Sequence, residues 1–143
     1  MPLPFPLIYC YNSAMFQVRV NTDFAAAHFL KDYHGKCENL HGHNYKVYAH
    51  VQGNTLDQGG MLLDFTELKR ALKEVCAVLD HRNLNEIAFF EQNPSAERIA
   101  LYIYNGIIEK LPCLKKTDDS GKTHLWAVDV FETETNRARY VSD

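Results

Sequence analysis

The stretch HGHNYKVYAHV, residues 41–51, carries two histidines at alternate positions and then an apolar residue at every second position from Tyr45 to Val51. This alternation is the pattern of a half-buried β-strand. Because alternate side chains of a strand point to the same face, His41 and His43 can aim their imidazoles at one point. The stretch therefore predicts both a strand of the fold and part of a ligand site.

A second strand is predicted upstream of this one. Residues 16–22, FQVRVNT, also alternate between apolar and polar side chains, and we expect them to pair with residues 44–51. His28 follows this segment, and a polar connection leads from there to the first stretch. If the two strands pair, His28 brings a third imidazole close to His41 and His43.

Three neutral ring nitrogens without an obvious fourth protein ligand are the donor set of a catalytic zinc site, which keeps one coordination position open. Imidazole also binds copper, nickel and iron, so the donor set favours zinc without selecting it. The alternative is three unrelated histidines, some of them hydrogen-bonded in the core. The spacing thus predicts a metal site, with Zn²⁺ as the leading ion.

Two helices are predicted between the pairs of strands. In the segment 61–80, Asp64 is followed three residues later by Glu67, as at the start of a capped helix, and apolar residues then recur at helical spacing. The second helix is expected to begin with Asn93 as its cap and Pro94 in its first turn.

Residues 125–133 and residues 139–142 are predicted to form two further strands. The order strand, strand, helix, helix, strand, strand predicts an α+β fold, with a four-stranded antiparallel sheet and two helices on one face. The other face and both edges of such a sheet need cover. Oligomerisation that continues the sheet between subunits would provide it.

The chain of 143 residues fits one domain, residues 16–143, after an N-terminal extension of residues 1–15. A formal net charge of −3 without a Lys/Arg run gives no footprint for nucleic acid. No stretch approaches the roughly 20 apolar residues that span a bilayer. The first residues lack the basic start of a signal peptide, and the four cysteines lack a C-x-x-C pair, so we expect free thiols in a reducing cytoplasm.

Two further groups could move protons at the predicted site. Cys37 stands four residues before His41, and a nearby cation would lower the pKa of its thiol and make it a general base. It could instead be a fourth zinc ligand, which would make the site structural and closed. Asp80 and His81 are adjacent, and the carboxylate could orient and charge the imidazole for proton transfer.

A carboxylate near the end of the third predicted strand could bind a flat heterocycle. Glu132, if buried, could accept two parallel hydrogen bonds from an amidine-like group such as a pterin or guanine edge. Glu134 is the competing candidate, because strand periodicity would place both residues on one face.

Several segments together resemble a known family. They occur in the order FAAAH (24–28), CENLHGHNY (37–45), GGMLLDFTELK (59–69), LDHRNLN (79–85), NPSAE (93–97) and ET (132–133), followed by Tyr140. In this combination the chain resembles the 6-pyruvoyltetrahydropterin synthase family, which includes bacterial 6-carboxytetrahydropterin synthase of the queuosine pathway. Each segment alone would be a weak signal, and the combination is specific.

The resemblance implies the tunnelling fold, in which the sheets of a trimer close into a barrel and trimers commonly pair into hexamers. It implies a zinc ion on His28, His41 and His43. A homo-hexamer built as a dimer of trimers is therefore expected, with a small-molecule pterin triphosphate as the only further partner.

The resemblance also implies roles for the remaining candidates. Cys37 would be the proton-abstracting base, and Asp80 and His81 would be the partner acid/base pair, reaching the pocket across a subunit boundary. Glu132 would anchor the pterin. Ser95 stands where relatives often carry threonine, so the hydroxyl is kept.

The substrate implied by the resemblance is 7,8-dihydroneopterin triphosphate. The family has three outcomes: a pyruvoyl product, the 6-carboxy product of the queuosine branch with loss of triphosphate and acetaldehyde, and a 6-hydroxymethyl pterin for folate. The folate branch tends to carry a glutamate at or near the cysteine position, and this chain has both Cys37 and Glu38. We expect the 6-carboxy branch and keep the other two as alternatives.

Two classes of protein without this activity remain as rivals. One is a binding module in which a metal only holds the fold around a pterin or purine. The other is a metal-free α+β domain with scattered histidines.

Overall fold

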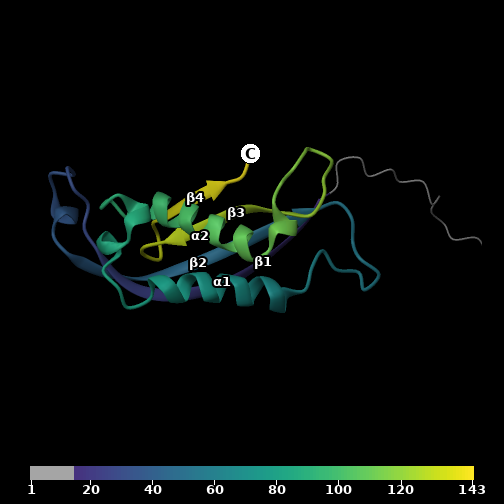
Figure 1. Cartoon of the computed structure of the whole chain (residues 1–143), viewed down its shortest axis with the longest axis horizontal. Helices are drawn as coiled ribbons and strands as arrows, with labels where there is room; N and C mark the ends of the chain where they lie inside the picture. The colour runs from purple at the N-terminus through teal and green to yellow at the C-terminus, as the bar shows by residue number, and fades with distance from the viewer. Residues whose placement is uncertain (1–14) are drawn as a thin grey trace, which may run out of the picture.

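The computed structural model describes residues 15–143, and the predicted extension lies almost wholly outside this range, as does Cys10. The chain forms β1 (Phe16–His28), β2 (His41–Gly53), α1 (Phe65–Leu79), α2 (Ala96–Lys110), β3 (His124–Phe131) and β4 (Arg137–Val141), with short 3₁₀ turns between them (Figure 1). The predicted order of elements and the α+β class are confirmed. None of the described helices is long and apolar enough to cross a membrane.

The four strands form one antiparallel sheet in the order β1-β2-β3-β4. The pairing of β1 with β2 runs from Phe16 opposite Gly53 to His28 opposite His41, so β1 continues well beyond the predicted residues 16–22. The alanines at its far end lack the usual strand signal, and tertiary pairing holds them extended. The backbone of residues 81–82 also bonds to this end of β1, with His81 N–H donating to the carbonyl of Ala25 at 2.6 Å.

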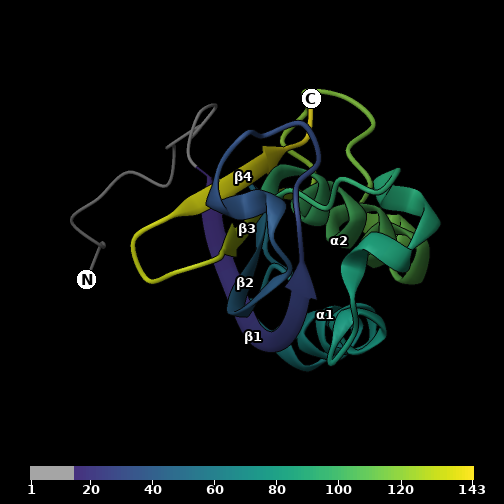
Figure 2. The ribbon, with the colours of Figure 1, turned by 90° about the vertical axis from the view of Figure 1, so that its left-hand side faces the viewer.

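Both helices cover the same face of the sheet (Figure 2). The odd-numbered residues of β2 from Tyr45 to Val51 are fully buried against them, as the alternation predicted. Where the two helices meet, a Cβ on Gly106 would lie 2.8 Å from both methyl groups of Val75, so only glycine allows this close approach. The packed layer fixes the helix-facing side of β1 and β2, where the site lies.

The predicted cap of α1 is confirmed, and the predicted cap of α2 is not. Asp64 is the cap of α1 and accepts a hydrogen bond from the N–H of Thr66 at 2.7 Å, as expected for an N-cap. The predicted cap of α2, Asn93, is wrong: Ser95 is the cap, and its hydroxyl accepts from the N–H of Arg98 at 3.3 Å. The reason is that the Asn93 side chain accepts instead from the backbone of Lys31 at 3.0 Å.

The helix-free face of the sheet carries a buried carboxylate. Asp129 is 3% exposed and accepts two hydrogen bonds from Arg139, at 2.6 and 2.8 Å, and one from His50 at 2.7 Å. Burial acts to raise the pKa of Asp129, but the hydrogen bonds from Arg139 and His50 outweigh it and hold the pKa below its ordinary value. Arg139 also lies over the ring of Trp126, at 5.1 Å from its centre. This network ties β2, β3 and β4 together.

Replacing Asp129 by asparagine is expected to lower the free energy of unfolding by about 2–3 kcal/mol, because it leaves a partly buried arginine without its counter-ion. Urea unfolding followed by circular dichroism measures this change. Asp119→Asn is the matched control, since it removes a carboxylate that pairs with Lys116 at 2.9 Å while 94% exposed. Equal stability of the two variants would contradict the structural role given to Asp129.

Candidate functional site

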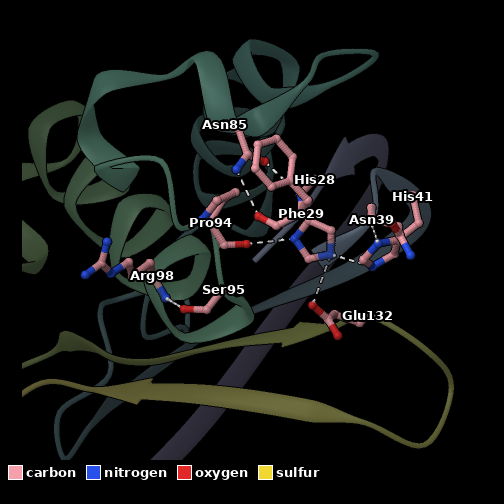
Figure 3. A network of polar contacts seen from close by, with 9 residues as sticks. All are labelled: His28, Phe29, Asn39, His41, Asn85, Pro94, Ser95, Arg98 and Glu132. Carbon is pink, nitrogen blue, oxygen red and sulfur yellow. Dashed lines mark hydrogen bonds and ion pairs between the residues drawn. The ribbon is translucent and has the colours of Figure 1, made fainter. Parts of the chain in front are cut away.

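Three histidines converge where β1 ends and β2 begins. His28 is the last residue of β1 and lies opposite His41, the first residue of β2, and His43 follows two positions later on the same face. One ring nitrogen from each lies within 4.8 Å of the other two. Figure 3 shows His28 and His41 facing each other beside the start of α2. The strand pairing therefore brings together all three predicted metal ligands.

The hydrogen bonds of two of these rings fix where their protons lie. Nδ1 of His28 is 2.8 Å from the carbonyl oxygen of Pro94, and Nδ1 of His41 is 2.7 Å from that of Asn39. A carbonyl can only accept, so each Nδ1 donates and each neutral ring presents an unprotonated Nε2. The two Nε2 atoms are 3.1 Å apart, with lone pairs facing. A metal cation between them would accept both lone pairs.

The spacing of these nitrogens fits a metal ion. Two ligands at the usual zinc–nitrogen length in a tetrahedral site stand about 3.3 Å apart. The carbonyls of Pro94 and Asn39 orient the two rings in the way that outer partners orient metal-binding imidazoles. Among the described residues, Cys37 is not part of the group of nearby ligand atoms, so the three histidines alone supply the protein donors of this cluster.

Burial keeps two of the three rings neutral. His28 is 1% exposed, and burial lowers its pKa from the ordinary histidine value, although the nearby charge of Glu132 acts in the opposite direction. Burial lowers the pKa of His43 in the same way. A neutral imidazole is the form that binds a metal, so the local structure keeps these ligands ready near neutral pH.

These lowered pKa values predict how the metal-free protein responds to acid. In the unfolded chain the imidazoles of His28 and His43 take up protons near pH 6.5, whereas in the folded chain they resist until a lower pH. The unfolded state therefore binds more protons as the pH falls below about 6.5, and the free energy of unfolding must decrease.

Urea unfolding of protein treated with chelator, at pH 7.5 and at pH 5.5, measures this effect. We expect the lower stability at pH 5.5, and a smaller difference for the variant His43→Gln. The variant His34→Gln is the control, because the side chain of His34 is 87% exposed. Equal or higher stability at pH 5.5 would contradict the burial of neutral imidazoles.

Glu132 lies beside this cluster. It follows the last residue of β3, is 27% exposed, and places Oε1 at 3.7 Å from Nε2 of His28. Glu134 is exposed, because the strand ends at Phe131 and Glu132 N–H donates to the carbonyl of Asn136 at 3.2 Å in the following turn. The expectation that both carboxylates share a strand face is therefore wrong, and Glu132 is the one at the site.

Cys37 lies in the short turn η1 (Lys36–Glu38), is partly buried, and accepts a hydrogen bond through its carbonyl from the N–H of Leu30 at 2.7 Å. The carboxylate of the neighbouring Glu38 accepts a hydrogen bond from the backbone N–H of His34 at 3.0 Å, which closes the same loop. The two candidate bases thus differ in their surroundings, with Glu38 already engaged in holding the loop.

Asp80 and His81 form a pair at the outer edge of β1. Asp80 accepts a hydrogen bond from the N–H of Ala25 at 2.9 Å, which is the main cause of its lowered pKa, and its second oxygen lies 2.9 Å from Nδ1 of His81. His81 has a φ of +56° and is 83% exposed beside an open hollow of about 490 Å³ that is also lined by Ala27, Gly42 and His43.

Over residues 15–143, no hydrogen bond or ion pair joins His81 to Cys37 or to the three histidines. Among the described residues, the pair is thus not hydrogen-bonded to the cluster, although His81 and His43 line the same hollow.

Ser95 follows Pro94, whose carbonyl contacts His28 of the cluster. The Ser95 hydroxyl caps α2. Asn85 was not among the predicted site residues. Its side chain forms hydrogen bonds that hold the segment after β1 in place. It accepts from the N–H of Phe29 at 2.9 Å and donates to the carbonyls of Phe29 and Gln92, both at 2.9 Å (Figure 3). Its position inside LDHRNLN was the available signal, but a single asparagine in a loop does not reveal its partners.

Comparison with known proteins agrees with this geometry. A 6-carboxy-5,6,7,8-tetrahydropterin synthase from Synechocystis is 36% identical over 83% of this chain and 88% of its own length. A dihydroneopterin monophosphate aldolase from Pyrococcus furiosus is 40% identical over 78% of this chain and 89% of its own length.

A solved 6-pyruvoyltetrahydropterin synthase of Plasmodium vivax shares the fold, with a TM-score of 0.69 and 26% identity over 89% of this chain and 97% of that one. It is a glutamate-to-alanine variant described as a catalytic residue mutant. The sequence model of 6-pyruvoyl tetrahydropterin synthase matches residues 17–143. The relatives are pterin-processing lyases, and the chain belongs to the 6-pyruvoyl tetrahydropterin synthase family.

Proposed function

We propose that this protein is a zinc-dependent lyase that converts 7,8-dihydroneopterin triphosphate to 6-carboxy-5,6,7,8-tetrahydropterin, with release of acetaldehyde and triphosphate, in cytoplasmic queuosine biosynthesis. The observation that carries the proposal is the pair of unprotonated Nε2 atoms of His28 and His41 at 3.1 Å, with His43 beside them. The Synechocystis relative supports the choice of branch.

His28, His41 and His43 would hold Zn²⁺. When bound, the ion would polarise the hydroxyl groups of the substrate side chain and make the adjacent positions more acidic. The three histidines leave one face of such an ion open to a hydroxylated ligand, as a catalytic site requires.

The pterin would be held by the chain's own carboxylate. Glu132 is close to His28 and partly exposed, so it can accept two parallel N–H bonds from the amidine-like edge of a pterin. Ser95, at the start of α2, would line the same pocket. Cys37 would take the proton from the side-chain carbon, because it lies in the loop that leads into His41 and its thiol is not engaged as a metal ligand.

Asp80 and His81 would return the proton in a site completed by a second subunit. Among the described residues of one chain, neither forms a hydrogen bond with the three histidines, so a neighbouring copy would supply them. Among the described strands, β4 lies at one edge of the sheet and pairs on one side only, which suits a trimer that closes the sheets into a barrel, and two such trimers would give the expected homo-hexamer.

Cleavage of the side chain to a 6-hydroxymethyl pterin is the second candidate. It is favoured by Glu38 beside Cys37 and by the identity to the Pyrococcus aldolase. The hydrogen bond from His34 to the Glu38 carboxylate argues against it, since that carboxylate would have to leave its loop to act as a base.

A product assay distinguishes these outcomes. Purified protein is incubated with 7,8-dihydroneopterin triphosphate, and the products are identified by mass spectrometry. We expect 6-carboxytetrahydropterin and acetaldehyde. A 6-hydroxymethyl pterin would assign the folate-type branch, a pyruvoyl pterin the biopterin branch, and an unchanged substrate would contradict the proposed activity.

A further inference from the structure

Tyr45 carries a buried hydroxyl group that the fold does not use. Its side chain is fully buried, and Oη has no hydrogen-bond partner among the residues that the structure describes. Leaving a buried hydroxyl unpaired costs about 1–3 kcal/mol, so a phenylalanine would be the more stable choice if only packing mattered.

The ring of Tyr45 already does the packing. It stacks on Phe24 with the ring centres 4.8 Å apart, and the rings of His28 and His43 meet it edge-on at 5.9 and 5.4 Å. These contacts involve ring atoms only. The role of the ring and the role of the hydroxyl can therefore be separated by one substitution.

Glu132 is an acceptor that lies beside the same histidine as this donor. It directly follows Phe131, the last residue of β3, which pairs with Lys46 of β2. Its Oε1 lies 3.7 Å from Nε2 of His28, and the ring centre of His28 lies 5.9 Å from that of Tyr45. Among the described residues, no hydrogen bond to the Glu132 carboxylate is present.

We propose that Tyr45 is a positioning residue that donates a hydrogen bond from its phenolic O–H to the Glu132 carboxylate when a pterin is bound. This inference rests on the proposed function, in which Glu132 is the pterin anchor. A metal on Nε2 of His28 leaves that atom no proton to share with Glu132, so the carboxylate needs another donor to hold it. The buried phenol of Tyr45, whose ring contacts that of His28, supplies that donor without adding charge to the site.

Tyr45→Phe tests this proposal. Binding of neopterin to the zinc-loaded protein is measured by the change in pterin fluorescence, with zinc content and melting temperature measured in parallel. We expect about tenfold weaker binding, unchanged zinc content and an unchanged or higher melting temperature. Tyr48→Phe is the matched control, because Tyr48 lies on the same strand with its side chain on the opposite face, and it should bind like the unmodified protein.

A double-mutant cycle shows whether Tyr45 acts through Glu132. Glu132→Ala should weaken binding further than Tyr45→Phe, and adding Tyr45→Phe to it should then have no further effect. Unchanged binding in Tyr45→Phe, or an equal loss in the Glu132→Ala background, would overturn the proposal while leaving the proposed function intact. Full binding by Glu132→Ala would overturn the proposed anchor and the proposal with it.

Discussion

Replacing His43 by alanine is expected to abolish stable metal binding, with the affinity for Zn²⁺ reduced by at least about a hundredfold. Mutating a residue that only hydrogen-bonds to a metal ligand already lowers metal affinity by about 10–100-fold. His43 is itself a predicted ligand, one of the three imidazoles that converge among the described residues. The ring of His43 lies 5.1 and 4.9 Å from the rings of His28 and His41, so its loss leaves two ligands, too few for a tight site.

Metal analysis of tag-free protein by mass spectrometry measures this effect, with zinc titration in competition with a chelator to obtain the affinity. His34→Ala is the matched control, since it removes an exposed histidine a few residues upstream. The control should keep close to one zinc per chain. If His43→Ala also keeps full zinc, the three histidines are not the metal site and the catalytic account is wrong.

Replacing Cys37 by alanine is expected to lower the turnover of 7,8-dihydroneopterin triphosphate by about 10²–10⁴-fold, which is the usual contribution of a positioned general base. Zinc content should not change, because the thiol lies outside the group of converging ligand atoms. Steady-state kinetics with product analysis, together with zinc analysis of the same samples, measures both quantities.

Glu38→Gln is the control for this experiment. The amide can still accept the hydrogen bond from the backbone of His34, so the loop should stay closed and turnover should stay within a few-fold of that of the unmodified protein. The opposite result, with activity lost in Glu38→Gln and kept in Cys37→Ala, would identify the glutamate as the base and favour the aldolase-type branch. Loss of zinc in Cys37→Ala would show that the thiol is a ligand and support the binding-module alternative.

The parts of this structure that follow from local periodicity could be predicted from the sequence. The alternation in residues 41–51 predicted both the buried face of β2 and the shared direction of His41 and His43. Asp64 was predictable as a helix cap, because a cap bonds to the backbone only two residues away. Such features depend on neighbours in the sequence, and the sequence displays those neighbours.

The parts that depend on distant contacts could not be predicted. Asn93 lost the role of helix cap because its side chain bonds to the backbone of Lys31, far away in the sequence. The carbonyl of Pro94, which orients His28, belongs to the backbone, so no residue type in the sequence indicates this contact. The choice of Glu132 over Glu134 depended on where β3 ends, and strand ends are the least certain part of a periodic pattern.

The placement of Asp80 and His81 shows a third limit. The sequence identified the pair, and its resemblance to the family implied a role across a subunit boundary. In the described chain the pair lies at the edge of β1, where Asp80 bonds to Ala25, and His81 lines the same hollow as His43. The role across a subunit boundary stays a prediction, and sequence alone does not indicate which part of the sheet a loop residue contacts.

Zinc K-edge X-ray absorption of the tag-free, zinc-loaded protein tests the central claim most directly. The account predicts nitrogen and oxygen neighbours only, at about 2.0–2.1 Å, with the imidazole scattering of three histidines. A sulfur neighbour at about 2.3 Å would show Cys37 closing the coordination sphere, and fewer than three imidazoles would separate the metal from His28, His41 and His43. Either result would contradict an open, three-histidine catalytic site.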